Sequence, residues 1–489
     1  MLFNSLDFAI FFSIVFVLYW LVSGNRRWRN ILVLVSSYVF YGWWDWRFLF
    51  LIAISSIVDF FVGQRLYNEK DVKIRKRLLL ISLIVNLGFL VYFKYTNFLI
   101  DTFVDSFRLF GKELEITTLK IILPVGISFY TFQTLSYTID IYRQQLKPTK
   151  DWLSFFAFVA FFPQLVAGPI ERASHLLPQF YKTYKFNYEQ VKSGLLLMVF
   201  GLFKKMVIAD RAALYVNEVY NNPGSYEGIE TIIATVCFAF QIYCDFSGYS
   251  DIAIGAARTM GFDLMKNFDS PYLSKSITEF WRRWHISLST WFRDYVYIPL
   301  GGSRKGKYRT YYNLFIVFLV SGLWHGAAMT FVIWGVIHGV IIVAEKAISK
   351  RKEKVFSLLK IDKRTFANKL FFMGITFTIV CFAWVFFRAN SFADSTTIIA
   401  GFFTNNFNEL FGDNLYLIGF KEHEFSLLAL SILSLTLLER FHRKQSILSI
   451  LNKQPIVFRW AVYLSIAVFI TIFGVYGSEV PSEFIYFQF

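Results

Sequence analysis

The chain has 489 residues, of which 56% are hydrophobic and 20% are aromatic. Its mean hydropathy of +0.47 exceeds what a soluble domain of this length needs to fill its core, which excludes an ordinary soluble protein and indicates a polytopic membrane protein. The formal net charge of +16 does not indicate a nucleic-acid partner, because the basic residues fall in short loops between apolar segments, as the positive-inside tendency requires.

Apolar stretches of about 17 to 25 residues are long enough to cross roughly 30 Å of hydrocarbon as helices. The first runs from Leu6 to about Ser23, and the preceding residues hold no Lys or Arg, so we interpret it as a span and not as a cleavable signal peptide. The pattern predicts an all-α polytopic protein with about eleven or twelve transmembrane helices. In chain order the expected spans are 6–23, 31–46, 48–66, 78–98, 119–141, 194–219, 231–257, 311–326, 329–346, 370–388, 425–439 and 456–477.

Loop charge predicts the sidedness of these spans. The basic clusters expected in the cytoplasm are Arg26 to Arg29, Lys70 to Arg77, Arg143 to Lys150, Lys346 to Lys369 and Arg440 to Lys453. The loops expected outside carry little positive charge or an acidic excess, and they are Asp101 to Glu115, Asn221 to Glu230 and Asn405 to Glu424. Both ends of the chain are then expected to face outward.

Two further segments are expected to be re-entrant or interfacial. Phe155 to Glu171 is interrupted by Pro163 and by Gly168-Pro169, and Ser274 to Gly302 mixes aromatic with charged residues between basic flanks. Irregular backbone at membrane depth is tolerated only where it is buried in protein or lines a cavity. Both segments are therefore candidate cavity walls.

No loop exceeds about 25 polar residues, well below the roughly 50 that a separate folded domain needs, so we predict one membrane-embedded domain over residues 1–489. Chemistry outside the membrane would then need a partner. We find no internal repeat of the kind that marks many transporters. Three cysteines are too few for a disulfide framework, and the six histidines lack zinc-type spacing, so no metal site is predicted.

Ser276 to Leu300 is expected to form an amphipathic helix. Ser276 and Glu279 have capping-box spacing, Glu279 and Arg283 are four residues apart and can pair, and Arg293 with Asp294 marks a polar end. An aromatic and apolar stripe recurs at three- and four-residue intervals, comprising Trp281, Trp284, Leu288 and Trp291. His285 can share the buried edge of this stripe, and from the segment alone a surface helix with a stacked histidine and a functional site weigh equally.

His325 is the stronger candidate for a functional histidine. It lies about fifteen residues into an apolar span that starts near Tyr311, hence roughly 20 Å along the helix from its cytoplasmic end. Gly322 and Gly326 flank it and permit close approach of a neighbouring backbone or a substrate. A neutral imidazole there can act as a general base; the alternative is a histidine bonded to a neighbouring helix. His338 is expected on the next helix in a packing role.

A third polar group occurs inside the apolar span 231–257. Gln241, Asp245 and Asp251 stand among hydroxyl residues there, which predicts either a water-filled or substrate-lined cavity or a buried network that holds helices together. The two interpretations weigh equally. Asp245 is a candidate for orienting a catalytic histidine.

These residues carry a resemblance to a known family. The runs Trp281 to Gly302, Ser321 to Gly339 and Gln241 to Gly255, with the break Ala167-Gly168-Pro169-Ile170-Glu171, resemble the membrane-bound O-acyltransferase family, and within it the bacterial alginate O-acetylation-type branch. The similarity covers nearly the whole chain, including the aromatic ending Phe484 to Phe489, and is densest from about residue 160 to 345.

The resemblance implies helices around a central funnel or tunnel, with the family's invariant histidine at His325 and its second motif histidine at His285. Our working hypothesis is that His325 takes the proton of the acceptor hydroxyl, while His285 positions the donor or stabilises developing charge. The side chains expected to line the tunnel or support the two histidines are Trp324, Trp284, Asp245, Gln241, Asp251, Arg282, Arg283, Arg293 and Asp294.

As further implications of the resemblance, the donor is an acyl thioester, commonly acetyl-CoA, which binds as a substrate with no permanently bound cofactor. An extracytoplasmic SGNH-type acetyltransferase is the expected partner, and a bacterial cytoplasmic membrane the expected location. The loop Ser303 to Arg309 can attract donor phosphates or anionic lipid headgroups equally well. A flippase without bond chemistry and a membrane scaffold for the outer transferase are the alternative functions. The acceptor polymer does not follow from the sequence.

Overall fold

The helices of this protein fall into two compact units. The computed structural model describes residues 1–108, 110–111, 118–362, 364–412, 414–421, 423–443, 445, 447–476 and 484–485, and these residues form helices, turns and irregular segments with no β-strand. Unit 1 comprises Met1–Met198 and Ser250–Met265, and unit 2 comprises Val199–Tyr249 and Lys266–Phe489. The predicted all-α class is confirmed.

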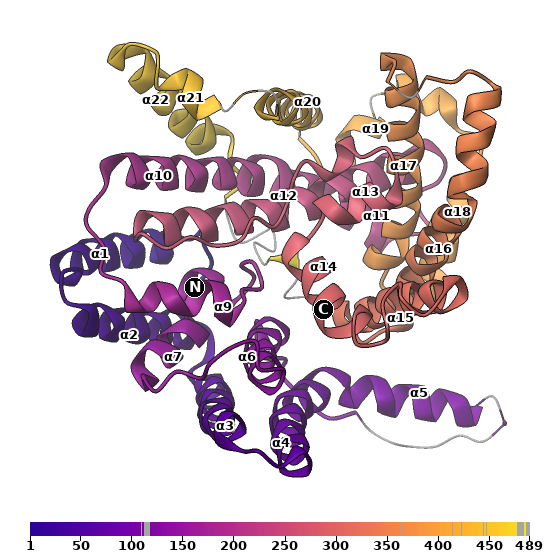
Figure 1. The fold of residues 1–489 in the computed structure, drawn as a ribbon. Helices are drawn as coiled ribbons and strands as arrows, with labels where there is room; N and C mark the ends of the chain where they lie inside the picture. The colour runs from indigo at the N-terminus through magenta and orange to yellow at the C-terminus, as the bar shows by residue number, and fades with distance from the viewer. Residues whose placement is uncertain are drawn as a thin grey trace. The chain divides into compact units, whose positions relative to one another are not determined.

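Unit 1 is built from the N-terminal helices (Figure 1). They are α1 (Leu6–Val22), α2 (Arg26–Asp45), η1 (Trp46–Phe48), α3 (Leu49–Asn68), α4 (Val72–Leu90), the π-helical η2 (Val91–Tyr95), α5 (Thr96–Arg108), α6 (Ile127–Tyr142), α7 (Trp152–Val159), α8 (Phe162–Leu165), α9 (Ala173–Leu176) and η3 (Leu177–Tyr181). The unit also holds most of α10 (Tyr188–Leu202) and the last turns of α12 (Ile229–Thr259).

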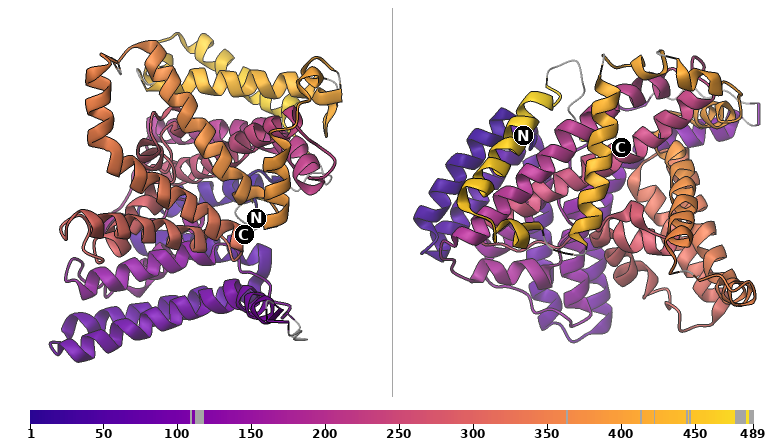
Figure 2. Two further views of the ribbon diagram at one scale, coloured as in Figure 1. Left: turned by 90° about the vertical axis from the view of Figure 1, so that its right-hand side faces the viewer. Right: turned by 90° about the horizontal axis from the view of Figure 1, so that it is seen from above.

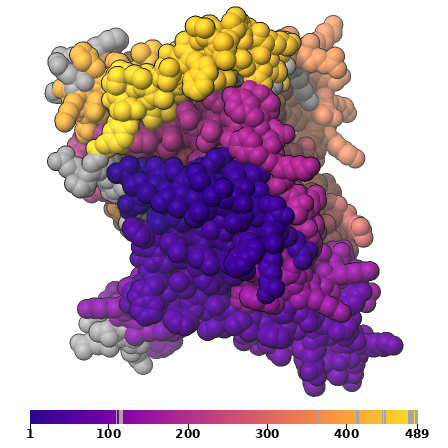
Figure 3. Space-filling view, turned by 90° about the vertical axis from the view of Figure 1, so that its left-hand side faces the viewer, coloured from indigo at the N-terminus to yellow at the C-terminus, as the bar shows by residue number. Residues whose placement is uncertain are grey.

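Helix α1 shows why these helices lack a polar face. One stripe, at Phe8, Phe12, Val15 and Tyr19, is buried inside the unit. The opposite stripe is equally apolar but exposed, and Leu6 and Leu21 at its ends are each 75% exposed. A helix that is apolar all round needs an apolar solvent, which the bilayer supplies. In the space-filling view of Figure 3 this N-terminal part of unit 1 forms a broad outer face.

A buried polar network ties α3, α4 and α6 together. Asp59 on α3 is fully buried and accepts hydrogen bonds from Ser82 Oγ at 2.5 Å and Asn86 Nδ2 at 2.9 Å, both on α4. Thr134 of α6 donates to Asn86 Oδ1 at 3.1 Å. Because each buried polar atom here has a partner, the network sets the register of three helices inside an apolar bundle.

The segment predicted to be broken, Phe155 to Glu171, is broken and buried. Helix α7 ends at Val159, α8 is a single turn, and extended backbone follows to α9. Gly168 is required, because a Cβ atom there would lie 2.3 Å from the Cα atom of Gln164. The side chain of Glu171 is fully buried and accepts from His175 Nδ1 at 2.8 Å and from the backbone N–H of Met265.

Unit 2 holds the remaining helices. They are the rest of α10, the π-helical η4 (Phe203–Ala209), α11 (Asp210–Asn221), most of α12, η5 (Pro271–Leu273), α13 (Ile277–Arg283), α14 (Ile286–Phe292), the π-helical η6 (Arg293–Tyr297), α15 (Lys307–His325), α16 (Met329–Leu358), α17 (Phe366–Arg388), α18 (Phe392–Gly401), η7 (Phe407–Phe411), α19 (Asn414–Leu417), α20 (Glu424–His442), α21 (Ile447–Leu451) and α22 (Ile456–Phe473).

The hairpin of α15 and α16 is the tightest helix pair of unit 2. A Cβ atom on Gly322 would lie 2.4 Å from the carbonyl oxygen of Phe331, and one on Gly335 would lie 2.6 Å from that of Phe318. The expected close approach at Gly322 is therefore confirmed, with a neighbouring backbone as the partner. Helix α16 packs in turn against α17 (Figure 2).

Each of the twelve predicted spans contains a helix. Among the described residues, seven helical stretches are long and apolar enough to cross a membrane, and Arg26–Asn68 alone contains two of the predicted spans. Helix α6, which corresponds to the predicted span 119–141, begins later than predicted, at Ile127. Pro124 and Gly126, which has a left-handed backbone, precede it. Part of the loop predicted to be external at 101–115, parts of the loop 405–424 and most of the aromatic ending lie outside the described residues.

Candidate active site

His285 occupies a break between two short helices. Ser276 Oγ caps α13 by accepting from Glu279 N at 3.0 Å, so the predicted helix start is correct. The prediction of one continuous helix is wrong, because α13 ends at Arg283 and α14 begins at Ile286. His285 takes up the turn with a left-handed backbone, φ 44° and ψ 56°. Such a conformation is strained for a non-glycine residue and recurs at functional sites.

Asn267 holds this break in place. Its backbone carbonyl accepts from Ile286 N at 2.9 Å, and its side-chain Oδ1 accepts from Ser287 Oγ at 2.9 Å. The same Oδ1 lies 3.0 Å from Nδ1 of His285. Because Oδ1 can only accept, Nδ1 of His285 carries the proton and Nε2 carries the lone pair. The sequence analysis did not single out Asn267. It lies 18 residues before His285, and no local pattern connects the two residues.

The His285 ring is fully buried among aromatic rings. Its centroid lies 4.7 Å from that of Phe246 and 6.0 Å from that of Trp324. Burial lowers the pKa of His285 to about 3, so the ring is neutral at physiological pH. The stacked histidine of the structural interpretation agrees with this ring packing, and the functional interpretation of His285 stays a prediction.

His325 is the last residue of α15. Counted from Lys307, it lies roughly 27 Å along the helix at 1.5 Å per residue. It is 3% exposed, and its ring lies 4.8 Å from Trp324, 5.0 Å from Trp334 and 5.3 Å from Phe387. The chain then turns through Gly326 into α16. His325 is thus enclosed by three aromatic rings from α15, α16 and α17.

Trp324 connects the two candidate histidines. Its ring lies within 6.0 Å of His285 and 4.8 Å of His325, and it is 4% exposed. Trp334 extends the series, because its ring lies 5.0 Å from His325 and 4.9 Å from His338. The sequence placed His338 on the next helix, as observed, but missed Trp334 and Phe387. The signal available was the four-residue spacing of Trp334 and His338, which puts both on one face of a helix.

Trp284 supports this group of rings. It is 1% exposed and its centroid lies 5.1 Å from both Phe268 and Trp384. Trp384 in turn stacks on Trp334, at 5.9 Å and 17°. Phe268 and Trp284, from the segments between helices, thus form one packed block with Trp334 of α16 and Trp384 of α17 beside the backbone of His285.

Asp245 belongs to a buried charge network. Its Oδ1 lies 2.7 Å from Nζ of Lys205, which also pairs with Asp210 at 2.8 Å, and its Oδ2 accepts from the backbone N–H of Ile485 at 2.6 Å. Asp245 was suggested to orient a catalytic histidine, but its partners are Lys205 and the N–H of Ile485. The side chain that holds the His285 ring is that of Asn267. Of the two interpretations for this region, the helix-holding network fits Asp245.

The other predicted polar residues are dispersed. Gln241 is half-buried on α12 in unit 2, and its Oε1 is buried with no hydrogen-bond partner among the described residues. Asp251, half-buried on the same helix, belongs to unit 1. Arg283 pairs with Glu279 as predicted, and Arg293 pairs with the adjacent Asp294.

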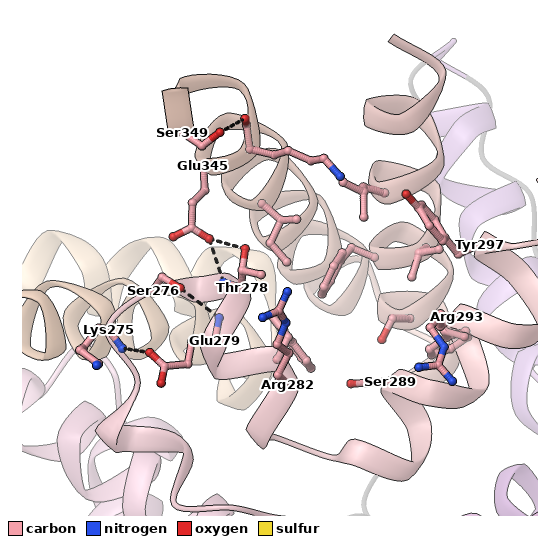
Figure 4. A pocket seen from close by; sticks show the side chains of 18 of the residues that line it. Lys275, Ser276, Thr278, Glu279, Arg282, Ser289, Arg293, Tyr297, Glu345 and Ser349 are labelled. Carbon is pink, nitrogen blue, oxygen red and sulfur yellow. Dashed lines mark hydrogen bonds between the residues drawn. The ribbon is translucent and has the colours of Figure 1, made fainter. Parts of the chain in front are cut away.

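A cavity of about 790 Å³ opens beside α13 and α14 (Figure 4). Trp281 and Phe318 form part of its apolar wall, and Ser321, one helical turn before His325, also lines it. Five basic and three acidic side chains line it: Lys275, Arg282, Arg293, Lys346 and Lys352, with Glu279, Glu345 and Glu353. Arg282 and Arg293, two of the residues expected to line a tunnel or support the histidines, point to this cavity. The lysines of α16 were not among the expected site residues. The basic loop Ser303 to Arg309 is not among the lining residues described.

No group of three or more His, Cys, Asp or Glu side chains among the described residues is arranged to hold a metal ion. Glu345, labelled in Figure 4, is instead engaged by Thr278, whose N–H donates at 2.9 Å and whose hydroxyl donates at 2.5 Å.

Comparison with known proteins decides the family. The model of the membrane-bound O-acyltransferase family matches residues 144–386, a range that contains both His285 and His325. A probable alginate O-acetylase of Pseudomonas aeruginosa is 42% identical over 395 residues, covering 80% of this chain and 72% of that protein. The chain belongs to the membrane-bound O-acyltransferase family. The resemblance stated from the motifs is therefore confirmed.

Two other relatives of this membrane-bound O-acyltransferase have names that refer to different polymers. A peptidoglycan O-acetyltransferase of Helicobacter pylori is 34% identical over 431 residues, covering 82% of this chain and 79% of that protein. A teichoic acid D-alanyltransferase of Bacillus subtilis is 28% identical over 279 residues, covering 55% and 69%. The protein is a multi-pass membrane enzyme that transfers acyl groups to oxygen.

Proposed function

We propose that this enzyme takes an acetyl group from a cytoplasmic thioester and transfers it, within the membrane, to a hydroxyl reached from outside, for O-acetylation of an extracellular or cell-wall polysaccharide. Relatives named for alginate and for peptidoglycan acetylation support this substrate class. The observation that carries the proposal is the Trp324 ring, which links His285 to His325. Ser321, one helical turn before His325, lines a cavity with basic walls.

The cavity suits a phosphate-bearing donor such as acetyl-CoA. Lys346 and Lys352 belong to the basic cluster that loop charge assigns to the cytoplasm. Arg282 and Arg293 are exposed and can approach a diphosphate, which guanidinium groups bind in a bidentate manner. The apolar surface at Trp281 and Phe318 then faces the chain that carries the thioester. The donor acts as a substrate, and the proposed reaction calls for no resident cofactor.

The two imidazoles are assigned different tasks. We assign His325 the proton of the attacking hydroxyl, because a base in this position converts a weak nucleophile into a strong one. His285 is neutral and fixed by Asn267, so we assign it to hold the reacting groups in place. Trp324 keeps the two rings at a constant spacing.

We further propose a bacterial cytoplasmic membrane as the location and an extracytoplasmic SGNH-type acetyltransferase as the partner that completes transfer to the glycan. The basic clusters and apolar outer helices fit an inner membrane, and the described residues form only helices and their connections, with no separate extramembrane fold.

The test is acyl transfer by purified protein in nanodiscs, with radiolabelled acetyl-CoA and with the glycan and outer transferase added separately. His325→Ala should lower kcat by roughly 10² to 10⁴, the usual range for a general base. His442→Ala, at an exposed position at the end of α20, is the matched histidine control and should keep normal activity. Wild-type rates in folded His325→Ala would reject the enzymatic role of this residue. Glycan or acetyl movement without bond formation would favour a flippase, and activity of the outer transferase without acyl-CoA turnover would favour a scaffold.

A further inference from the structure

Helix α16 carries two buried side-chain nitrogens, Trp334 Nε1 and His338 Nε2, to which the proposed reaction has so far assigned no role. Trp334 and His338 are four residues apart and both are fully buried. Among the described residues, neither Trp334 Nε1 nor His338 Nε2 has a hydrogen-bond partner. Buried polar groups in folded proteins are nearly always bonded, so two exceptions in one cluster require an explanation such as a catalytic role.

The contact between Trp281 and His338 fixes the protonation of this imidazole. The indole N–H of Trp281 donates to Nδ1 of His338 at 3.3 Å. Nδ1 is therefore the acceptor, and in a neutral ring the proton is on Nε2. His338 thus presents a hydrogen-bond donor, as does the indole of Trp334.

The rings that carry these two donors contact rings of the cavity wall and also the His325 ring. The Trp281 and Phe318 rings, which wall the cavity, lie 5.0 and 6.2 Å from the His338 ring. On the other side the Trp334 ring lies 5.0 Å from His325. Gly335 lies between Trp334 and His338 in the sequence and holds α16 against α15, so the donors and His325 keep a fixed separation.

We propose that Trp334 Nε1–H and His338 Nε2–H form the oxyanion site of the transfer reaction, holding the carbonyl oxygen of the acyl group; this rests on the proposed function. In the step, the acceptor oxygen forms a bond to the acyl carbon as its proton passes to His325. The carbonyl oxygen becomes an oxyanion and receives both hydrogen bonds. The carbon–sulfur bond then breaks, and the leaving thiolate takes the proton back from His325. Neutral donors preorganised in a water-poor site stabilise such a charge better than water does.

The test uses variants that separate the donor from the ring. His338→Asn can keep an acceptor for Trp281 through Oδ1 but lacks a donor at the Nε2 position, whereas His338→Gln can return an amide N–H to that position. Removing one oxyanion donor typically costs about 10² to 10³ in kcat. We expect that loss in His338→Asn and in Trp334→Phe, with the KM for acetyl-CoA unchanged, and recovery to within about tenfold of the wild-type kcat in His338→Gln.

Trp460→Phe is the control for loss of an indole N–H. Trp460 is 54% exposed on α22 and belongs to none of the ring contacts described around His285 and His325, so its replacement should leave kcat within about threefold. Binding of S-ethyl-CoA, which lacks the carbonyl oxygen, should be the same in the wild type, His338→Asn and Trp334→Phe. Size-exclusion profiles and thermal unfolding confirm that each variant is folded.

Three results would overturn the oxyanion site: normal kcat in His338→Asn and Trp334→Phe, equal damage in His338→Gln and His338→Asn, or weaker binding of S-ethyl-CoA with kcat preserved. The last two would make His338 a packing residue. Failure of the proposed function is distinct, since the wild-type protein itself would then fail to cleave acetyl-CoA.

Discussion

Replacement of Lys205 by methionine tests whether the buried charges of unit 2 hold the fold together. Lys205 is 5% exposed and lies 2.8 Å from Asp210 and 2.7 Å from Asp245, which are 5% and 3% exposed. Removal of one partner from a buried ion pair costs about 3 to 5 kcal/mol, because a charge is left without compensation. Here two carboxylates lose their common cation, so we expect Lys205→Met to destabilise by at least about 3 kcal/mol.

The assay is reversible unfolding of the purified protein in mixed micelles, followed by far-UV circular dichroism. The double variant Lys205→Met/Asp245→Asn removes one of the stranded charges and should recover part of the loss, whereas additive losses are expected of independent sites. Asp245→Asn alone keeps an oxygen for the N–H of Ile485 but weakens that bond, since hydrogen bonds to charged groups are worth about 1.5 to 3 kcal/mol. A change below about 1 kcal/mol in Lys205→Met would show that water reaches the site and refute the argument from desolvation.

Three further outcomes follow from local geometry. Gly322→Ala should destabilise by roughly 1 to 3 kcal/mol through overpacking of the α15–α16 hairpin, while Gly374→Ala, with no atom within 4 Å of the added Cβ, should be neutral or slightly stabilising in the same unfolding assay. Arg282→Ala should raise the KM for acetyl-CoA, and the wild-type KM should rise with ionic strength, because Arg282 lines the cavity; unchanged values in steady-state kinetics would place the donor elsewhere. The hydrogen bond to the Glu171 carboxylate raises the pKa of His175, so protonation of His175 stabilises the fold fully below about pH 6.5, and this effect is lost as the pH rises through the folded pKa of His175. Burial raises the pKa of Glu171, so ionisation of Glu171 also lowers stability as the pH rises. The Tm of the wild type should therefore fall as the pH is raised from 6 to 8. The Tm of His175→Gln should change less over the same pH range.

The helices of this protein could be predicted because their cause is local. An apolar run of the right length must satisfy its backbone internally, so it forms a helix wherever it lies in the bilayer. The breaks at Pro163 and Gly168 were equally visible, because proline restricts the backbone and lacks an N–H donor, whereas the conformational freedom of glycine destabilises a helix interior. The break at His285 was not, because Ser276 to Trp291 has helical periodicity, and the turn depends on hydrogen bonds from Asn267, a residue distant in the sequence.

The candidate site was predicted only in part. His325 and Trp324 were recognisable, since ionisable and indole groups stand out in an apolar span. The partners of Asp245 were not, because Lys205 lies on another helix and its pairing is a property of tertiary packing. Likewise, nothing local shows that Trp281 donates to His338 across 57 positions.

The left-handed backbone of His285 separates two kinds of selection at that position. At φ 44° the conformation favours glycine and asparagine on steric grounds, so a saturation library sorted only for expression level should enrich these two residues. The same library sorted for glycan acetylation should return histidine. Divergence between the two sorted pools would mean that the enzyme retains, for its chemistry, a side chain that its own main chain disfavours.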